Sequence, residues 1–199
     1  MATNPCVGCK YDTACGDPKR TKPCAGRVAR RSAGGLPTEK LTATAKLPTR
    51  GSTDAAGLDF YIDSVELRDM DDPFTKGYYT PTPVDGTHVM LEPYQKFKIH
   101  TGIACAIPEG CVGLLFNRSG IALKQDLRLA NCVGVIDADY RGEIVGVFQS
   151  DCPECQTIEL GARAVQLVIV PYLLLDPMLV DKLPETDRGA GGFGSTGTT

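Results

Sequence analysis

Short apolar stretches separated by turn residues are the feature that most constrains the fold of this 199-residue chain. From residue 42 onward, such stretches alternate with turn signals such as Asp85-Gly86 and Pro108-Glu109-Gly110. Runs of this length bounded by Gly, Pro and Asp are typical of β-strands. The strands that we expect are 58–61, 88–91, 97–103, 113–116, 132–136, 143–148, 157–160 and 164–170. The pattern predicts an all-β fold, a mostly antiparallel barrel or sandwich, with one short helix around 119–124.

The two ends of the chain differ from this central part in composition. Residues 1–40 are rich in Cys, Gly, Pro, Lys and Arg and lack a periodic apolar pattern, so we expect an extension that contributes little to the core. Residues 41–184 form the expected barrel domain, with a surface loop inserted at about 68–83, where regular alternation is absent. Residues 185–199 are rich in glycine and form either a disordered tail or a flexible lid.

Charge and histidine content exclude several classes of function. The formal net charge of -3 and the pI near 5.4 give no general attraction to nucleic acid or to an anionic membrane. No run is long enough to span a bilayer, and the first ten residues lack the apolar core of a secretion signal, so we expect a cytoplasmic location. His88 and His100 lie in no pattern typical of a Ser-His-Asp triad or an HExxH zinc site. Any chemistry is therefore expected to depend on carboxylates, arginine and backbone groups.

The glycine-rich end carries residues that a plain tail does not need. Arg188, Phe193, Ser195 and Thr196 are interleaved with its glycines. A cation, an aromatic face, two hydroxyls and free backbone N–H groups are what a flexible flap needs to close over a nucleoside polyphosphate. This composition favours the lid.

The string "NCVGVIDADYRGEI", residues 131–144, is the strongest single motif. An apolar strand runs directly into Asp137, Tyr140 follows three residues later, and Gly142 permits a turn. A carboxylate and an aromatic ring are thereby expected beside one pocket. For "DADY" alone, an ordinary acidic hairpin turn would be the better interpretation.

Five stretches together resemble, in order, the five motifs of the trimeric dUTP diphosphatase (dUTPase) family: "AKLPTRGSTDAAGLDFY" (45–61), "NRSGIA" (117–122), residues 131–144, "GARAVQLVIVPY" (161–172) and "RGAGGFGSTG" (188–197). The resemblance implies a dUTPase-like barrel of the jelly-roll type and hydrolysis of dUTP to dUMP and diphosphate. That reaction limits uracil incorporation into DNA and supplies dUMP for thymidylate synthesis. The resemblance also implies Mg²⁺ and a homotrimer with shared active sites. Asn117 and Ala162 depart from the residues common in the family, which are proline and an acidic residue.

The resemblance also assigns roles to individual residues. Asp137 is implied to orient and deprotonate the attacking water, and Asp59 to bind hydrated Mg²⁺ through water. Tyr140 is implied to pack against deoxyribose, where a 2′-hydroxyl would collide with the ring. The remaining implied contacts are Arg118, Ser119, Gly120, Gln166, Arg188, Ser195 and Thr196 to the phosphates, and Asn131, Phe193 and the backbone around Ile136 to uracil.

The cysteines of the extension form a separate motif. Four thiolates within one short polar segment can hold a tetrahedral Zn²⁺. The alternatives are an arm with free thiols, an iron–sulfur cluster, or a zinc site in which the first two of these cysteines pair with the "CPEC" of residues 152–155. The four cysteines of the segment are Cys6, Cys9, Cys15 and Cys24. The arm is also basic, a composition that is compatible with nucleic-acid contact, but we expect its charges to be solvated instead.

The sequence is also compatible with two alternative functions. A dCTP deaminase of the same superfamily relies on a catalytic glutamate in another motif context. A regulatory dUTPase-like protein would bind partners while hydrolysing little. The intact set Asp59, Arg118, Asp137, Tyr140 and Arg188 argues against an inactive enzyme.

Overall fold

The computed structural model describes residues 34–69 and 77–192, and it confirms the all-β fold. Within these residues the helix α1 spans Ser119–Gln125. The strands are β1 (Thr38–Lys40), β2 (Leu58–Tyr61), β3 (Ser64–Arg68), β4 (Tyr78–Tyr79), β5 (His88–Leu91), β6 (Lys96–Cys105), β7 (Cys111–Asn117), β8 (Leu127–Leu129), β9 (Gly134–Ile136), β10 (Glu143–Ser150), β11 (Gln156–Glu159) and β12 (Arg163–Pro171).

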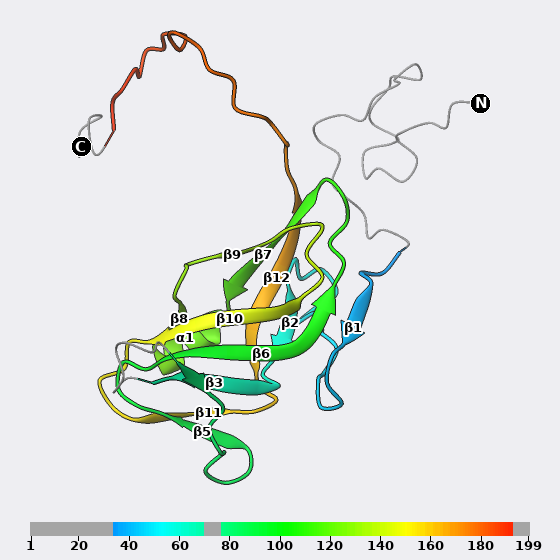
Figure 1. The fold of residues 1–199 in the computed structure, drawn as a ribbon, viewed down its shortest axis with the longest axis vertical. Helices are drawn as coiled ribbons and strands as arrows, with labels where there is room; N and C mark the ends of the chain where they lie inside the picture. Colours follow the sequence, from blue (N-terminus) through cyan, green and yellow to red (C-terminus); the bar gives the residue numbers. More distant parts are fainter. Residues whose placement is uncertain (1–33, 70–76, 193–199) are drawn as a thin grey trace.

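The strands pair antiparallel in three sheets. One sheet has the order β4-β3-β6-β10-β8 with β1 beside β6, a second has the order β2-β12-β7-β9, and β11 pairs with β5. In Figure 1, β3, β6 and β10 run side by side, and β7 and β12 cross their direction. β6 joins three neighbours, since β1, β3 and β10 all pair with it.

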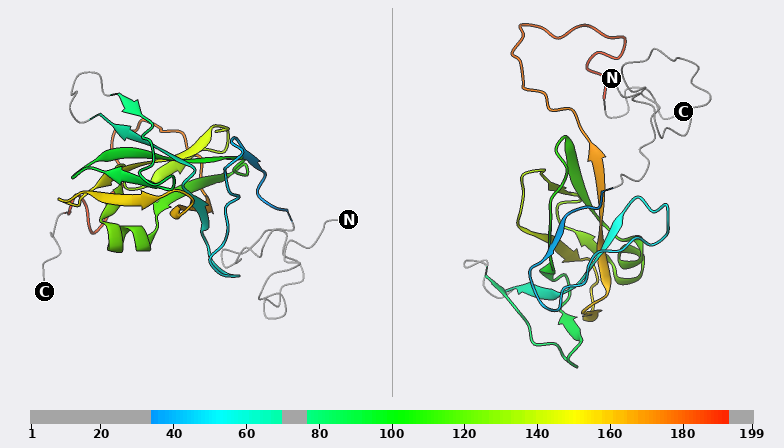
Figure 2. Two further views of the ribbon diagram at one scale, coloured as in Figure 1. Left: turned by 90° about the horizontal axis from the view of Figure 1, so that it is seen from below. Right: turned by 90° about the vertical axis from the view of Figure 1, so that its right-hand side faces the viewer.

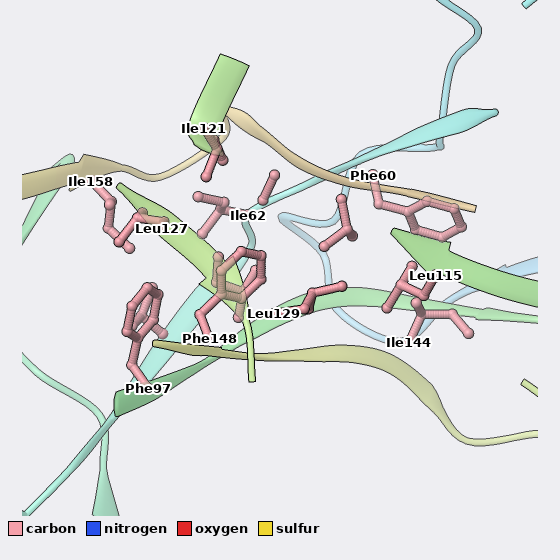
Figure 3. Packing of buried hydrophobic residues seen from close by; sticks show 14 of the residues in the cluster. Phe60, Ile62, Phe97, Leu115, Ile121, Leu127, Leu129, Ile144, Phe148 and Ile158 are labelled. Atoms are coloured by element: carbon pink, nitrogen blue, oxygen red, sulfur yellow. The ribbon is translucent and has the colours of Figure 1, made fainter. Parts of the chain in front are cut away.

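The core lies between the two larger sheets. Alternate residues of β10 are buried, which is the period expected of a strand with one face on a core. Phe148 of β10 pairs with Phe97 of β6, and their stacked rings are 5.6 Å apart between centroids. Leu115 of β7 and Phe60 of β2 contribute from the other sheet, and Ile121 of α1 is part of the same cluster (Figure 3). The strands that carry the motifs are thus fixed by one shared core.

All eight expected strands are present, and 58–61 and 88–91 have the expected bounds. The expectation was wrong at Cys132, which has a φ of 62° and precedes β9 in a turn. Left-handed backbone of this kind is incompatible with a strand.

Four strands were not anticipated: β1, β3, β4 and β8. β1 and β8 have three residues each and β4 has two, too few for a period to be read. β1 lies in the segment expected to be an extension. Arg68 ends β3 and Tyr78–Tyr79 forms β4, so part of the expected 68–83 loop extends the sheet.

No helix within residues 34–69 and 77–192 is long and apolar enough to cross a membrane.

Candidate active site

A pocket lies beside β9 and the start of β10, and it brings four of the expected residues together. Asn131, Ile136, Asp137 and Tyr140 line it, along with Glu143. β9 leads directly into Asp137, whose carbonyl accepts the N–H of Tyr140 at 3.2 Å and closes a turn. The carboxylate and the aromatic ring therefore face one pocket, as the sequence predicts.

The Tyr140 side chain folds back over the turn that carries it. Its hydroxyl donates a 2.9 Å hydrogen bond to the Glu143 carbonyl. The ring lies against Gly142, because a Cβ at that position would come within 2.6 Å of the Tyr140 Cζ atom. Tyr140 is still 43% exposed, so it remains accessible to a ligand. Gly142 is required here for close approach of the ring and not only for a turn.

A second group of expected residues surrounds Asp59. Asp59 is buried, with 7% of its residue surface exposed, and its carboxylate lies between two guanidinium groups. Its Oδ1 is 3.1 Å from Nε of Arg118, and its Oδ2 is 3.1 Å from Nη1 of Arg163. Gln166 pairs with Asp59 across β12 and β2. We refer to Asp59, Arg118, Arg163 and Gln166 as the Asp59 cluster.

Backbone groups of neighbouring residues pack against Gln166 of the Asp59 cluster. Gln166 donates from its side-chain amide to the Asn117 carbonyl at 3.2 Å. A Cβ at Gly57 would be 2.8 Å from the Gln166 Oε1 atom, so β2 can approach β12 here only with glycine.

Ser119 and Gly120 open α1 beside the cluster, where the first N–H groups of a helix have no intrahelical acceptor. Asn117, where the family often has proline, instead donates through its side chain to the Leu127 carbonyl at 2.7 Å and tethers β7 to β8.

The pocket and the Asp59 cluster lie towards opposite ends of β7. Ile136, which precedes Asp137, pairs with Gly113, whereas Arg118 directly follows the end of the strand. A rise of about 3.3 Å per residue puts roughly 16 Å of strand between these two positions. One chain therefore does not bring Asp137 and Asp59 together.

The chain leaves the barrel after β12 and extends away from it (Figures 1 and 2). Residues 171–190 are all exposed. This segment carries six strongly apolar side chains with exposed fractions of 75–99%, and they are Leu173, Leu174, Leu175, Met178, Leu179 and Leu183. Apolar surface of this extent marks an interaction site. Arg188 lies on the same extended segment, with its Nε bonded to the Gly191 carbonyl at 3.1 Å.

Several expected ligands lie outside the described residues, namely Phe193, Ser195, Thr196 and the cysteines Cys6, Cys9, Cys15 and Cys24. Of the expected second zinc pairing, Cys152 and Cys155 are described, and both are free thiols. Among the described residues, no group of three or more His, Cys, Asp or Glu side chains could hold a metal ion by itself. A cation at Asp59 would therefore need most of its oxygen ligands from water and a bound ligand.

Sequence reasoning did not anticipate Arg163 or Glu143. Arg163 is 104 residues from Asp59, and only the antiparallel pairing of β12 with β2 brings them together. Glu143 is quoted in the motif of residues 131–144, but its carboxylate points to β6 and bonds there to Gly102 and His100. No sequence pattern near Arg163 or Glu143 indicates these long-range contacts.

Comparison with known proteins agrees with this geometry. The sequence profile of the dUTPase family matches residues 86–197. The deoxyuridine 5'-triphosphate nucleotidohydrolase of Escherichia phage T5 is 38% identical over 160 residues, which are 80% of this chain and 97% of the phage protein. That of a Hydrogenobaculum species is 36% identical over 160 residues, which cover 80% of this chain and 95% of the relative.

A solved structure supports the same relationship. The dUTPase of Staphylococcus bacteriophage 80alpha, with dUpNHpp, is 29% identical, and the match covers 82% of this chain and 99% of the phage protein with a TM-score of 0.65. The family profile spans β5 to β12 and the segment that follows. This chain belongs to the dUTPase family.

Proposed function

We propose that this protein hydrolyses dUTP to dUMP and diphosphate. Its family and the named activity of its relatives carry this conclusion. The observation in the structure that best supports it is the pocket in which Asp137 and Tyr140 meet at the end of β9. The consequences would be less uracil in DNA and a supply of dUMP for thymidylate synthesis. The relatives reported above are dUTPases, so we set the dCTP deaminase alternative aside.

In the proposed reaction Asp137 acts as the general base. Its carboxylate takes a proton from a water molecule, whose oxygen attacks the α-phosphorus. The bond between this phosphorus and the bridging oxygen to the β-phosphate then breaks, and diphosphate leaves. Asp137 is exposed in the pocket, which gives it access to both water and substrate.

Nucleoside recognition is assigned to the same pocket. We propose that Tyr140 packs against the deoxyribose and that Asn131 and the backbone at Ile136 contact the uracil edge. A pocket whose hydrogen-bonding groups match uracil leaves buried groups unpaired when cytosine enters, which disfavours dCTP by as much as ~10⁴-fold. Phe193 would complete this environment by stacking on the base.

Phosphate and metal binding are assigned to the Asp59 cluster. Arg118, with Ser119 and Gly120 at the start of α1, supplies donors for phosphate oxygens. The buried Asp59 carboxylate fits a hydrated Mg²⁺ whose other ligands are water and phosphate oxygens, and Gln166 lies beside it. When bound, Mg²⁺ supplies Lewis-acid stabilisation of charge on the phosphates. Arg188, Ser195 and Thr196 would add contacts from the C-terminal lid.

We propose a homotrimer in which the site is shared between subunits. A general base at the α-phosphorus and the groups that hold the phosphates of the same dUTP molecule must lie within about the length of one triphosphate chain of each other. The separation of Asp137 from the Asp59 cluster along β7 is too large for this, which supports pairing the pocket of one subunit with the Asp59 cluster of another. The exposed apolar segment after β12 supports a lid that is carried on to a neighbouring subunit.

A regulatory role is the second candidate function. The 80alpha phage dUTPase, to which this chain is similar, is described as controlling transfer of virulence genes. A protein of this kind would bind partners through its extension and its inserted loop while hydrolysing little dUTP. A cytoplasmic location stays a prediction from the sequence.

The first experiment measures diphosphate release with Mg²⁺ from dUTP, dCTP, dTTP and UTP, using the wild-type protein and Asp137→Asn. We expect strong selectivity for dUTP in the wild type. Asp137→Asn should bind dUTP but lose ~10²–10⁴-fold in turnover, since general-base catalysis contributes about that much. Near-wild-type turnover by the variant would remove Asp137 from the role, and no release from dUTP by folded wild-type protein would favour the regulatory alternative.

Deletion of residues 187–199 tests the lid. We expect the truncated protein to keep its free energy of unfolding, because the described part of this segment is exposed and apart from the barrel. Turnover of dUTP should be abolished, since Arg188, Phe193, Ser195 and Thr196 are lost together. A truncated enzyme with full activity would refute the lid.

Zinc in the extension is proposed from cysteine spacing alone. Metal analysis of the purified protein, and of a variant with Cys152 and Cys155 replaced by serine, distinguishes the two candidate sites. Zinc retained in the variant assigns the site to Cys6, Cys9, Cys15 and Cys24, and zinc lost assigns it to the pairing of Cys6 and Cys9 with the "CPEC" turn. Folded wild-type protein without metal would dismiss both.

A further inference from the structure

An irregularity between β6 and β10 lies directly behind the nucleoside pocket. Glu143 pairs with Ala104 and Val145 with His100, so residues 101–103 of β6 lie opposite Ile144 alone. The extra residues form a bulge, in which Gly102 has a φ of +63°. A Cβ at this position would be 2.7 Å from the Cβ atom of the buried Ala45, so the bulge is closely packed.

The Glu143 carboxylate uses both its oxygens to bind this bulge. Oε1 accepts the N–H of Gly102 at 2.7 Å, and Oε2 lies 2.8 Å from Nδ1 of His100. An ionised carboxylate only accepts hydrogen bonds, so the imidazole donates from Nδ1. Charge-assisted bonds of this kind are among the stronger hydrogen bonds. The carboxylate is therefore held at a fixed place on β6.

On its other side, the His100 ring faces Glu66, and its buried Nε2 atom has no hydrogen-bond partner among the described residues. Its Nε2 lies 3.5 Å from Oε2 of Glu66 on β3, and the side chain is 20% exposed. Lys98 on β6 pairs with the same Glu66 oxygen at 2.8 Å, and this hydrogen bond is the main cause that lowers the pKa of Glu66. Lys98 also lies over the Tyr78 ring of β4. The hydrogen bond that fixes the imidazole is therefore the one from Nδ1 to Glu143.

Glu143 in turn restrains Tyr140. Its carbonyl accepts the Tyr140 hydroxyl at 2.9 Å, and the two residues line the same pocket. The two ends of Glu143 therefore connect His100 to the tyrosine ring through one residue. A shift of the Glu143 backbone would move the acceptor that holds the ring.

We infer that His100 is a positioning residue that sets the selectivity of the site for deoxyribose over ribose, by holding Glu143 and, through it, the Tyr140 ring. The inference rests on the proposed function, in which that ring faces the sugar. His100 does not touch the substrate. Its replacement is expected to change how well the ring excludes a 2′-hydroxyl more than it changes the chemistry at phosphorus.

The test compares kcat/KM for dUTP with kcat/KM for UTP in wild-type protein, His100→Leu and His100→Asn. The ratio of the two values does not depend on the fraction of active protein. His100→Leu removes the donor to Glu143 and should lower the ratio about tenfold or more, because small misplacements in a site can cost up to ~10²-fold. The amide nitrogen of His100→Asn can replace Nδ1 and should restore most of the ratio.

Lys98→Met is the matched control. Lys98 lies on the same strand and the same side of the sheet as His100. Its replacement removes the ion pair to Glu66 and leaves the contacts of Glu143 unchanged. Its selectivity ratio should equal that of the wild type. If His100→Leu does not fold, His100→Gln takes its place, since its amide nitrogen lies nearer the Nε2 position and should not restore the bond.

Three results would overturn the inference: an unchanged ratio in His100→Leu or His100→Gln, a loss in His100→Asn as large as in His100→Leu, or an equal loss in Lys98→Met. Failure of the proposed function is recognised separately, because the wild-type protein would then show no selective turnover of dUTP.

Discussion

The antiparallel ladder of β9, β7 and β12 is the constraint on which the rest of the site depends. Its register fixes Asp137 beside one end of β7 and Arg118 beyond the other. β12 adds β2 on its far side, which brings Asp59 level with Gln166. These strands contribute side chains to the buried core. A shift of their register by one residue would turn those side chains to the opposite face of the sheet. The distance between the two groups is thus a property of the fold.

Electrostatics at Asp59 follows from the same register. A carboxylate in a residue that is only 7% exposed would be costly without partners, and here two arginines compensate it. Arg118 comes from the end of β7 and Arg163 from the start of β12, so the pairing also connects three strands. In the proposed reaction, phosphate would compete for Arg118 and hydrated Mg²⁺ would take its place beside Asp59. The negative charge of Asp59 is therefore balanced by arginine before any ligand binds. The same cluster presents a carboxylate to a cation and guanidinium groups to phosphate.

The sequence predicted what depends on local pattern. The all-β fold, the eight expected strands and the helix at Ser119 are all present, because each lies in an apolar stretch bounded by turn residues. Strands β1, β4 and β8 were missed because two or three residues carry no period, and their pairing with longer strands defines them. The pocket residues Asn131, Ile136, Asp137 and Tyr140 were found together because they are close in sequence. Arg163 and the contact of Glu143 with His100 were missed because they depend on strand register across 104 and 43 residues.

Subunit mixing tests whether one working site combines the pocket of one subunit with the Asp59 cluster of another. Asp137→Asn and Arg118→Ala are each expected to be inactive alone. When the two are unfolded together and refolded as a mixture, the Arg118→Ala subunit supplies an intact pocket and the Asp137→Asn subunit an intact Asp59 cluster. If the site is shared, dUTP hydrolysis returns in the refolded mixture, and it does not return when the separately refolded variants are assayed together without exchange. A refolded mixture that contains mixed oligomers and stays inactive would contradict a shared site, since the complete site would then belong to a single chain.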